Sequence, residues 1–429
     1  MIIIGSLIIV CLMLLLGVSV FASFGVVLAF IALVGDQSIS GYLPTGETGL
    51  RSLVLLAIPL FMLAGGIMER GKIAAPLVSL SSMFVGHLKG GLSAAAVMAC
   101  GLFGSIAGSA NSTLMCIGSI MMPHLRKVNY PQGKSAALLV SASPLGLLIP
   151  PSANHILYGW IAQQHVLKLF LSTVIPAFIL LTLLIIVNQF LLRRHDDIKL
   201  SDIPRPFLPG LIAQGRAAGP ALMMPLIILG GIYGGVMTPT EAAGVAVVYA
   251  IPIAIYIYKG LTWKTLAESL YKSGITIGVV MLMIFMVLIV SDNLIAQGAP
   301  QIAQNLVYAV SDNPIVILLM INVVMILVGM LMDDISGLLL STPILLPIAQ
   351  SVGMDPIHFG AVIAVNLGMA NITPPTAPLL YLGAQITDTP IAKMLWPTLV
   401  FIVFAWLPTL MLTTFVPSLS MWLPELLLG

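Results

Sequence analysis

Long apolar segments recur along the whole of this 429-residue chain. Residues 175–192 and 274–290, for example, contain no charged side chain. A helix needs about 20 such residues to cross the roughly 30 Å hydrocarbon core of a bilayer. Because lipid offers no partners to backbone polar groups, each segment must satisfy its own N–H and C=O groups, as a helix does. A β-barrel would show short alternating segments instead. The sequence therefore predicts an all-α polytopic membrane protein.

The composition agrees with lipid as the solvent. Hydrophobic residues make up 59% of the chain and charged residues 7%, too few to coat a soluble domain. The net charge is +2 and the basic residues are scattered among short loops, so we expect no nucleic-acid partner. The three cysteines lack the spacing of a metal site. The apolar N-terminus is interpreted as a retained first helix.

We expect ten membrane-spanning helices and two re-entrant hairpins. The hairpins cover 90–124 and 313–350, and they are interrupted by GSANS (108–112) and MDDIS (332–336). Each would enter the membrane and return to the same side, which requires a tip buried in protein. The expected spanning helices are 2–20, 22–35, 53–69, 133–162, 166–192, 220–236, 241–258, 274–292, 357–388 and 393–416.

Basic residues are divided unevenly between the two sides of this topology. With the N-terminus outside, every Lys and Arg except Arg51 and Lys168 falls on the inside. Lys and Arg accumulate in short cytoplasmic loops, so the distribution supports the topology. The longest polar connection, 193–207, then lies in a cytoplasmic linker, 193–219, between a first half, 1–192, and a second half, 220–429.

The two halves contain an internal repeat. IPPSANHILYG (149–159) aligns without a gap on TPPTAPLLYLG (373–383), a shift of 224 positions, and the same shift places Pro123 on Pro347. In the topology above, one hairpin opens from the cytoplasm and the other from outside, so the halves would be inverted repeats. Many secondary transporters have this architecture and bind solute and ion at paired helix breaks near the midplane.

The Pro-Pro pairs predict unwound helices at 133–162 and 357–388. Proline lacks an N–H and pushes the preceding residue out of helical geometry, which frees carbonyl oxygens within the membrane. A cage of carbonyl and hydroxyl oxygens suits a hard cation such as Na⁺, and two cages predict two or more ions. Alternatively, the prolines only kink the helices and the glycines only allow close packing. The candidate Na⁺ ligands are Ser105, Gly108, Gly146, Ile149, Gly329, Met332, Asp333, Ala370 and Thr373.

Polar residues follow the breaks, where restarting half-helices present free N–H groups and the positive ends of their dipoles. An anionic solute would bind there. Asp333 and Asp334 form an acidic pair at membrane depth, which would bind a cation, relay a proton, or cap the second hairpin helix through Asp334. Glu241 is interpreted as part of a helix cap. The candidate solute-binding residues are Ser109, Asn111, Ser112, Ser152, Asn154, Asp334 and Thr376.

Six motifs along nearly the whole chain resemble those of the large membrane subunit of tripartite ATP-independent periplasmic (TRAP) transporters. They are AIPLFMLAGGIMERG (57–71), GHLKGGLS (86–93), GSIAGSANST (104–113), GLLIPPSA (146–153), GVMTPTEAAGVA (235–246) and NITPPTAPLL (371–380).

This resemblance implies an elevator-type, Na⁺-driven importer in the bacterial inner membrane. It would work with a small four-helix membrane subunit and a soluble periplasmic binding protein. Its solute would be an organic acid such as a C4-dicarboxylate, a sugar acid or sialic acid.

An intramembrane serine hydrolase is the main alternative, with Ser105, Ser109 or Ser112 as nucleophile and His155 as base. It does not explain why the Pro-Pro break is duplicated while His155 aligns on Leu379. A redox-driven antiporter subunit is a second alternative, but it would need Lys and Glu relays inside several helices, and no Lys is placed mid-helix.

Overall fold

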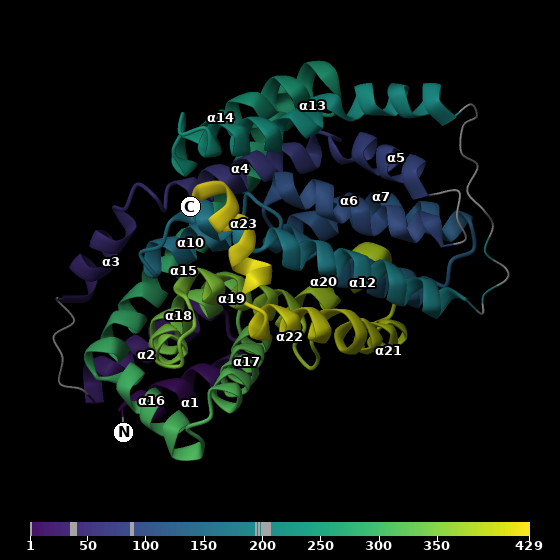
Figure 1. Cartoon of the computed structure of the whole chain (residues 1–429). Helices are drawn as coiled ribbons and strands as arrows, with labels where there is room; N and C mark the ends of the chain where they lie inside the picture. The colour runs from purple at the N-terminus through teal and green to yellow at the C-terminus, as the bar shows by residue number, and fades with distance from the viewer. Residues whose placement is uncertain (1, 35–40, 86–89, 194, 196–197, 199–206) are drawn as a thin grey trace.

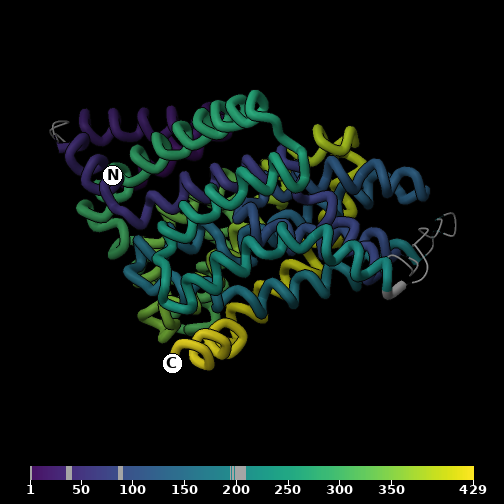
Figure 2. Tube along the Cα trace, turned by 90° about the horizontal axis from the view of Figure 1, so that it is seen from above, coloured from purple at the N-terminus to yellow at the C-terminus, as the bar shows by residue number. Residues whose placement is uncertain are grey.

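The computed structural model describes residues 2–34, 41–85, 90–193, 195, 198 and 207–429. Within these ranges all regular structure is helical, as expected (Figure 1). The long helices lie roughly side by side along the molecule (Figure 2).

The helices before the linker are, in chain order, α1 (Ile2–Leu15), α2 (Val20–Val34), α3 (Tyr42–Leu50), α4 (Ala57–Arg70), α5 (Ala74–Val85), α6 (Gly91–Ala107), α7 (Ala110–Lys127), α8 (Gln132–Ala142), α9 (Leu145–Leu148), α10 (Ala153–Ile161), α11 (Val166–Ser172) and α12 (Val174–Leu192). Those after it are α13 (Phe207–Tyr233), α14 (Pro239–Pro252), η2 (Ile253–Ile257), α15 (Trp263–Ala296), α16 (Ala299–Val310), α17 (Pro314–Leu331), α18 (Asp334–Ser351), α19 (Pro356–Ala370), α20 (Pro378–Thr387), α21 (Ile391–Phe401), η3 (Ile402–Trp406), α22 (Leu407–Phe415) and α23 (Ser418–Leu428).

Among the described residues, six helical stretches are long and apolar enough to cross a bilayer, and a bent pair, Gln132–Leu148 with Ala153–Ile161, would be a seventh. The chain is therefore a multi-pass membrane protein. Fewer stretches qualify than the ten expected, because several expected spans contain shorter helices. The six are Val166–Leu192, Pro209–Tyr233, Pro239–Ile257, Trp263–Ala296, Pro314–Leu331 and Ile391–Phe415.

Two helices begin earlier than the sequence analysis expected. α13 starts at Phe207, so the described end of the expected linker 193–219 is helical. The rest of that linker, apart from 193, 195 and 198, lies outside the described residues, as do 86–89 of one motif. α15 is a single helix of 34 residues that starts at Trp263 instead of 274.

Glu241 completes a capping box with Thr238, which confirms its interpretation as a cap.

Helix bounds repeat at the shift found in the sequence. α7 and α18 both have 18 residues, and their first residues, Ala110 and Asp334, are 224 positions apart. α6 and α17 end at Ala107 and Leu331, again 224 positions apart. α8 and α19 likewise begin at matched positions. Both Pro-Pro pairs lie between helices, and both prolyl bonds are cis.

Contacts between the two halves are reciprocal. α7 packs against α20, and its counterpart α18 packs against α10, the counterpart of α20. The second helix of each hairpin, α7 or α18, therefore meets the broken helix of the other half.

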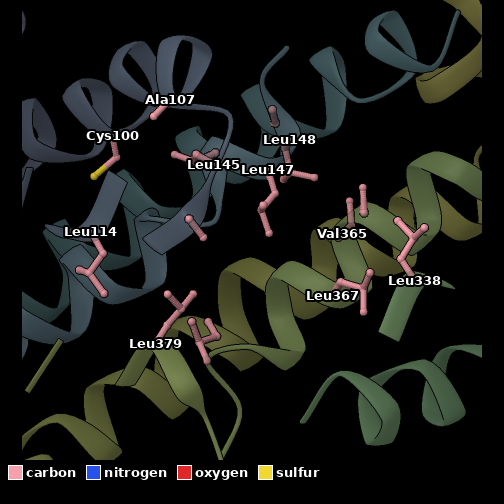
Figure 3. Close-up of a cluster of buried hydrophobic side chains, with 14 of the residues drawn as sticks. Cys100, Ala107, Leu114, Leu145, Leu147, Leu148, Leu338, Val365, Leu367 and Leu379 are labelled. Carbon is pink, nitrogen blue, oxygen red and sulfur yellow. The ribbon is translucent and has the colours of Figure 1, made fainter. Parts of the chain in front are cut away.

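The centre of the molecule is a continuous apolar core (Figure 3). Trp406 is fully buried, and its Nε1 donates to the carbonyl of Ser141 over 3.1 Å. Its ring lies so close to Gly368 that a Cβ there would come within 2.8 Å of it. Trp406, in η3, therefore joins the span Ile391–Phe415 to α8 and α19, the first segments of the two broken helices.

Candidate functional site

The break between α6 and α7 lies directly against the first Pro-Pro pair. Gly108 has φ +60°, a left-handed conformation that glycine adopts at little cost, and Ser109 is extended. A Cβ on Gly108 would come within 2.8 Å of the carbonyl oxygen of Pro151. The backbone at this break therefore leaves room only for glycine.

A second close approach, between the backbones of Gly104 and Gly146, lies beside this junction. A Cβ on Gly104 would lie 2.6 Å from the Cα of Gly146, and one on Gly146 would lie 2.8 Å from the carbonyl oxygen of Ser109. Thr113 donates to that same carbonyl over 2.8 Å. The structure thus brings together three residues predicted from the sequence, Gly108, Ser109 and Gly146, with main-chain oxygens at the junction.

The corresponding junction in the second half uses different contacts. Thr376 donates a hydrogen bond from its hydroxyl to the carbonyl of Met330, so the second break is tied to α17. A Cβ on Gly329 would lie 2.6 Å from the Cβ of Ala370. The structure therefore places four predicted residues around the break that follows α17: Gly329, Met332, Ala370 and Thr376.

The helix cap predicted for the second hairpin is one residue out of position. Asp333, with extended backbone, accepts from the N–H groups of Ile335 and Ser336 through Oδ2, at 3.2 and 3.4 Å. The cap is therefore Asp333, and the alternative that Asp334 caps this helix is wrong. Asp334 is the first residue of the helix, so its side chain is free to contact another element.

Asp334 contacts the first half. Asn154 donates from Nδ2 to Oδ2 of Asp334 over 2.9 Å, and Asn154 is only 2% exposed. This bond joins the start of α10, after the first Pro-Pro pair, to the start of α18, after the second hairpin break. Two predicted solute-binding residues that are 180 positions apart are therefore neighbours.

Several polar atoms at these helix starts have no hydrogen-bond partner among the described residues. They belong to buried or half-buried side chains, whereas most buried polar groups in proteins are paired. The unpartnered atoms are Ser152 Oγ, His155 Nδ1 and Nε2, Asp333 Oδ1 and Ser336 Oγ.

Other predicted residues are placed differently. The hydroxyl of Ser105 donates to Leu102 and that of Thr373 to Met369, both over 2.7 Å within or at the end of their own helices. Asn111 is exposed, and the side chains of Ser109, Ser112 and Ile149 are half-buried. Their ligand roles remain predictions.

The structure also shows a polar chain that the sequence analysis missed. Asn366 on α19 donates to Asn322 Oδ1 on α17 over 2.6 Å, and Asn322 donates to Thr414 Oγ1 on α22 over 3.1 Å. All three are buried. The sequence signal that could have found these hydrogen bonds is an Asn within an apolar run, because polar residues at membrane depth face protein.

The arrangement gives no support to a hydrolase. A serine hydrolase needs its nucleophile within hydrogen-bond reach of a base. His155 is 1% exposed, packs edge-on against Phe170 with ring centroids 6.1 Å apart, and neither ring nitrogen has a hydrogen-bond partner in the described structure.

Comparisons with known proteins agree with a transport protein. The family described as "Tripartite ATP-independent periplasmic transporter, DctM component" matches residues 4–419. The chain is 35% identical to the C4-dicarboxylate TRAP transporter large permease protein DctM of Pseudomonas aeruginosa, over 86% of each chain. It is 31% identical to the sialic acid TRAP transporter large permease protein SiaM of Vibrio cholerae, over 94% of each.

The fold is also similar to a solved structure. The YdaH transporter of Alcanivorax borkumensis superposes with a TM-score of 0.62 at 15% identity, over 91% of this chain and 88% of that one. The extent of the family match and the identity to these permeases show that the chain belongs to the DctM family, the large permease subunits of TRAP transporters.

Proposed function

We propose that this chain imports a small organic acid anion across the bacterial inner membrane, driven by Na⁺, through an elevator movement. The observation that carries the proposal is the Asn154–Asp334 contact, which brings two helix starts, one from each half, to one place. Paired breaks at the meeting of two repeats are where secondary transporters bind their cargo.

The residues at the breaks supply two kinds of group. Starting helices at α7, α10 and α18 point N–H groups and positive dipole ends toward the junctions, which favours a carboxylate. Main-chain carbonyls beside Gly108, Gly146 and the Pro-Pro pairs, together with Asp333, offer the oxygen ligands that Na⁺ prefers. Cation and anion together would cross the low-dielectric interior at lower electrostatic cost than either alone.

The moving unit would consist of the two hairpins, α6–α7 and α17–α18, with the broken helices α8–α10 and α19–α20. These elements pack tightly on one another through glycine contacts such as Gly104 on Gly146. The repeats would be inverted, so that the unit opens to one side and then to the other as it slides past the remaining spans.

Two partners are part of the proposal, a small four-helix membrane subunit and a soluble periplasmic binding protein. One relative, 32% identical and named isethionate TRAP transporter permease protein DctMQ, comes from Oleidesulfovibrio alaskensis, and this chain covers 62% of its length. The additional length of that relative supports a second component in transporters of this kind.

The names of the relatives support a solute class. Those reported above are named for C4-dicarboxylate, sialic acid and isethionate, and another is named for 2,3-diketo-L-gulonate. All are organic acids, so we propose a carboxylate or a similar organic anion.

The test is solute uptake into proteoliposomes that contain the chain and both partners. The cognate binding protein is first screened against candidate acids to choose the solute. An inward Na⁺ gradient is expected to drive accumulation, and an equal K⁺ gradient is the control. Equal uptake in Na⁺-free medium would exclude Na⁺ coupling.

A further inference from the structure

A cavity of about 580 Å³ lies where α3 and α10 of the first half meet α15 of the second half. α3 packs against α15, and all three helices are at the left of Figure 1. A Cβ on Gly49 would come within 2.7 Å of Leu288 Cδ1 and 3.9 Å of Trp160 Cη2, so glycine lets these elements approach. The volume is within the range of small-molecule sites, about 300–1,000 Å³. The lining includes Thr45, Thr48, Gly49, Trp160, Leu288 and Asp292.

A second cavity, of about 260 Å³, shares Trp160 with the first. The turn after α10 lines it, with the side chains of Gln163 and Gln164. Nε2 of Gln163 donates to the carbonyl of Trp160 over 2.7 Å, and Nε2 of Gln164 donates to the carbonyl of Ala162 over 3.0 Å. Because each amide nitrogen is bound to the backbone, the amide oxygen is the group that remains to accept from a ligand.

The polar groups of the larger cavity are also acceptors. The hydroxyl of Thr45 donates to the carbonyl of Gly41 over 3.1 Å, and that of Thr48 donates to the carbonyl of Pro44 over 2.8 Å. A hydroxyl has one hydrogen, so both threonine oxygens can only accept from a ligand. An ionised carboxylate, such as that of Asp292, likewise only accepts. A ligand that fits this lining must therefore supply the hydrogen-bond donors.

The charge of the larger cavity selects a cation. The one ion pair among the described residues joins Arg51 to Glu47 over 2.6 Å, so Asp292 has no basic partner there. Arg51 follows α3, close in sequence to the lining, but Glu47 already balances its charge. The face of an indole ring attracts cations through its quadrupole, and Trp is the aromatic residue that does so best. Asp292 and Trp160 in one cavity therefore favour a cationic ligand.

We infer that this cavity binds an organic ammonium ion, with the ammonium group between Asp292 and the ring of Trp160 and the apolar part against Leu288. The threonine oxygens accept its remaining N–H groups. The ammonium group belongs either to a free amine or to the headgroup of an ethanolamine phospholipid, which share this chemistry. In the described structure the lining residues belong neither to a Pro-Pro pair nor to a hairpin break. The inference therefore goes beyond the proposed function and does not depend on it.

Binding is measured by calorimetry with the complete chain in lipid nanodiscs. The probe is phenethylamine, whose amino group is charged at neutral pH, and the control ligand is phenethyl alcohol, which has the same ring and a neutral hydroxyl. The nanodiscs contain phosphatidylglycerol, which has no amine, and empty nanodiscs correct for adsorption of the probe to lipid. We expect phenethylamine to bind at least about fivefold more tightly than phenethyl alcohol, because only the amine forms a charge-assisted hydrogen bond with the carboxylate.

Matched variants locate the site. Asp292→Asn keeps the volume and removes the charge, so it should weaken phenethylamine binding at least about fivefold. Asp312→Asn is the control, because Asp312 is exposed in the connection between α16 and α17 and the charge change is the same. It should leave the affinity within about twofold. Trp160→Leu keeps an apolar side chain but removes the ring, so it should also weaken binding. Unfolding temperatures without ligand show whether each variant is folded.

A second set of nanodiscs, in which phosphatidylethanolamine replaces part of the phosphatidylglycerol, distinguishes the two sources. If the headgroup is the occupant, this lipid will raise the unfolding temperature of the unaltered chain but not of Asp292→Asn, and it will compete with phenethylamine. If a free amine is the occupant, phenethylamine will bind equally in both sets. Equal affinity for the amine and the alcohol, or equal affinity of Asp292→Asn and Asp312→Asn, would overturn the site. So would the absence of both probe binding and lipid stabilisation, and Na⁺-driven uptake would stand in each case.

Discussion

The side-chain amide of Gln132 donates a hydrogen bond to the backbone carbonyl of Asp388 over 2.7 Å. This bond joins the start of the first broken helix, at α8, to the end of the second, at α20. In the opposite direction, Tyr158 on α10 donates to the carbonyl of Pro356 at the start of α19. Gln132 and Pro356 are matched positions, so each broken helix ends against the beginning of the other. These hydrogen bonds therefore join α8 to the end of α20 and α10 to the start of α19, so the four segments would move as one unit.

The close approach of Gly104 to Gly146 gives a prediction about stability. Gly104→Ala places a methyl group 2.6 Å from a backbone atom that cannot turn aside. We expect a loss of about 1–3 kcal/mol. Gly278→Ala on α15 is the control, because nothing lies within 4 Å of its Cβ position, and it should be neutral or stabilising. Thermal unfolding in nanodiscs measures both, and equal unfolding temperatures would contradict the close packing.

The cap and cation roles of Asp333 can be separated. Asp333→Ala removes the acceptor of two N–H groups, so we expect a loss of about 1 kcal/mol in stability without Na⁺. Asp333→Asn keeps an oxygen that can cap the helix, and should retain that stability. If Asp333 also contacts the cation, Asp333→Asn will still need more Na⁺ for half-maximal uptake. Unchanged Na⁺ dependence in Asp333→Asn would leave the cap as the sole role.

The buried Asn366–Asn322–Thr414 chain should behave as a coupled unit. Asn322→Leu removes the nearer acceptor of the Asn366 amide, which keeps only a 3.3 Å hydrogen bond to the carbonyl of Val362, and should cost about 1–3 kcal/mol. Asn322→Leu combined with Asn366→Leu removes both polar groups, so it should cost less than the sum of the single changes. A double-mutant cycle by reversible unfolding measures the coupling, and simple additivity would show that the bond contributes nothing.

The topology is open to a chemical test. Gln163 and Lys393 are both exposed. Gln163 follows α10 on the expected periplasmic side and Lys393 lies in the first turn of α21 on the expected cytoplasmic side, so Gln163→Cys should react with an impermeant maleimide from the periplasm and Lys393→Cys should not. The three native cysteines are first replaced by alanine. Both variants should react after permeabilisation. Labelling of Lys393→Cys in intact spheroplasts would require the topology to be reversed or rebuilt.

Much of the fold is encoded locally. Continuous apolar segments fix the membrane class, because no other arrangement satisfies their backbone in lipid. The Pro-Pro pairs at 150–151 and 374–375 fix where helices break, and glycine at 108 marks the first hairpin break. Helix ends were harder to place, as α13 and α15 show, because apolar and polar flanks alike can continue a helix.

The site itself was only partly predictable. The sequence singled out Asn154 and Asp334 separately, from their positions after breaks, and the capping role that it considered for Asp334 belongs to Asp333. It could not pair Asn154 with Asp334, nor Asn366 with Asn322, because such pairs depend on which helix faces meet across the core.

The sequence by itself therefore determined the solvent, the positions of the breaks and the repeat, since each follows from hydropathy, proline geometry and periodic spacing along the chain. Tertiary structure alone decided that the two halves exchange partners, α7 with α20 and α18 with α10, and that Asn154 meets Asp334. The physical reason is that hydrogen bonds and packing depend on distance in space, and Asn154 and Asp334 are 180 positions apart along the chain.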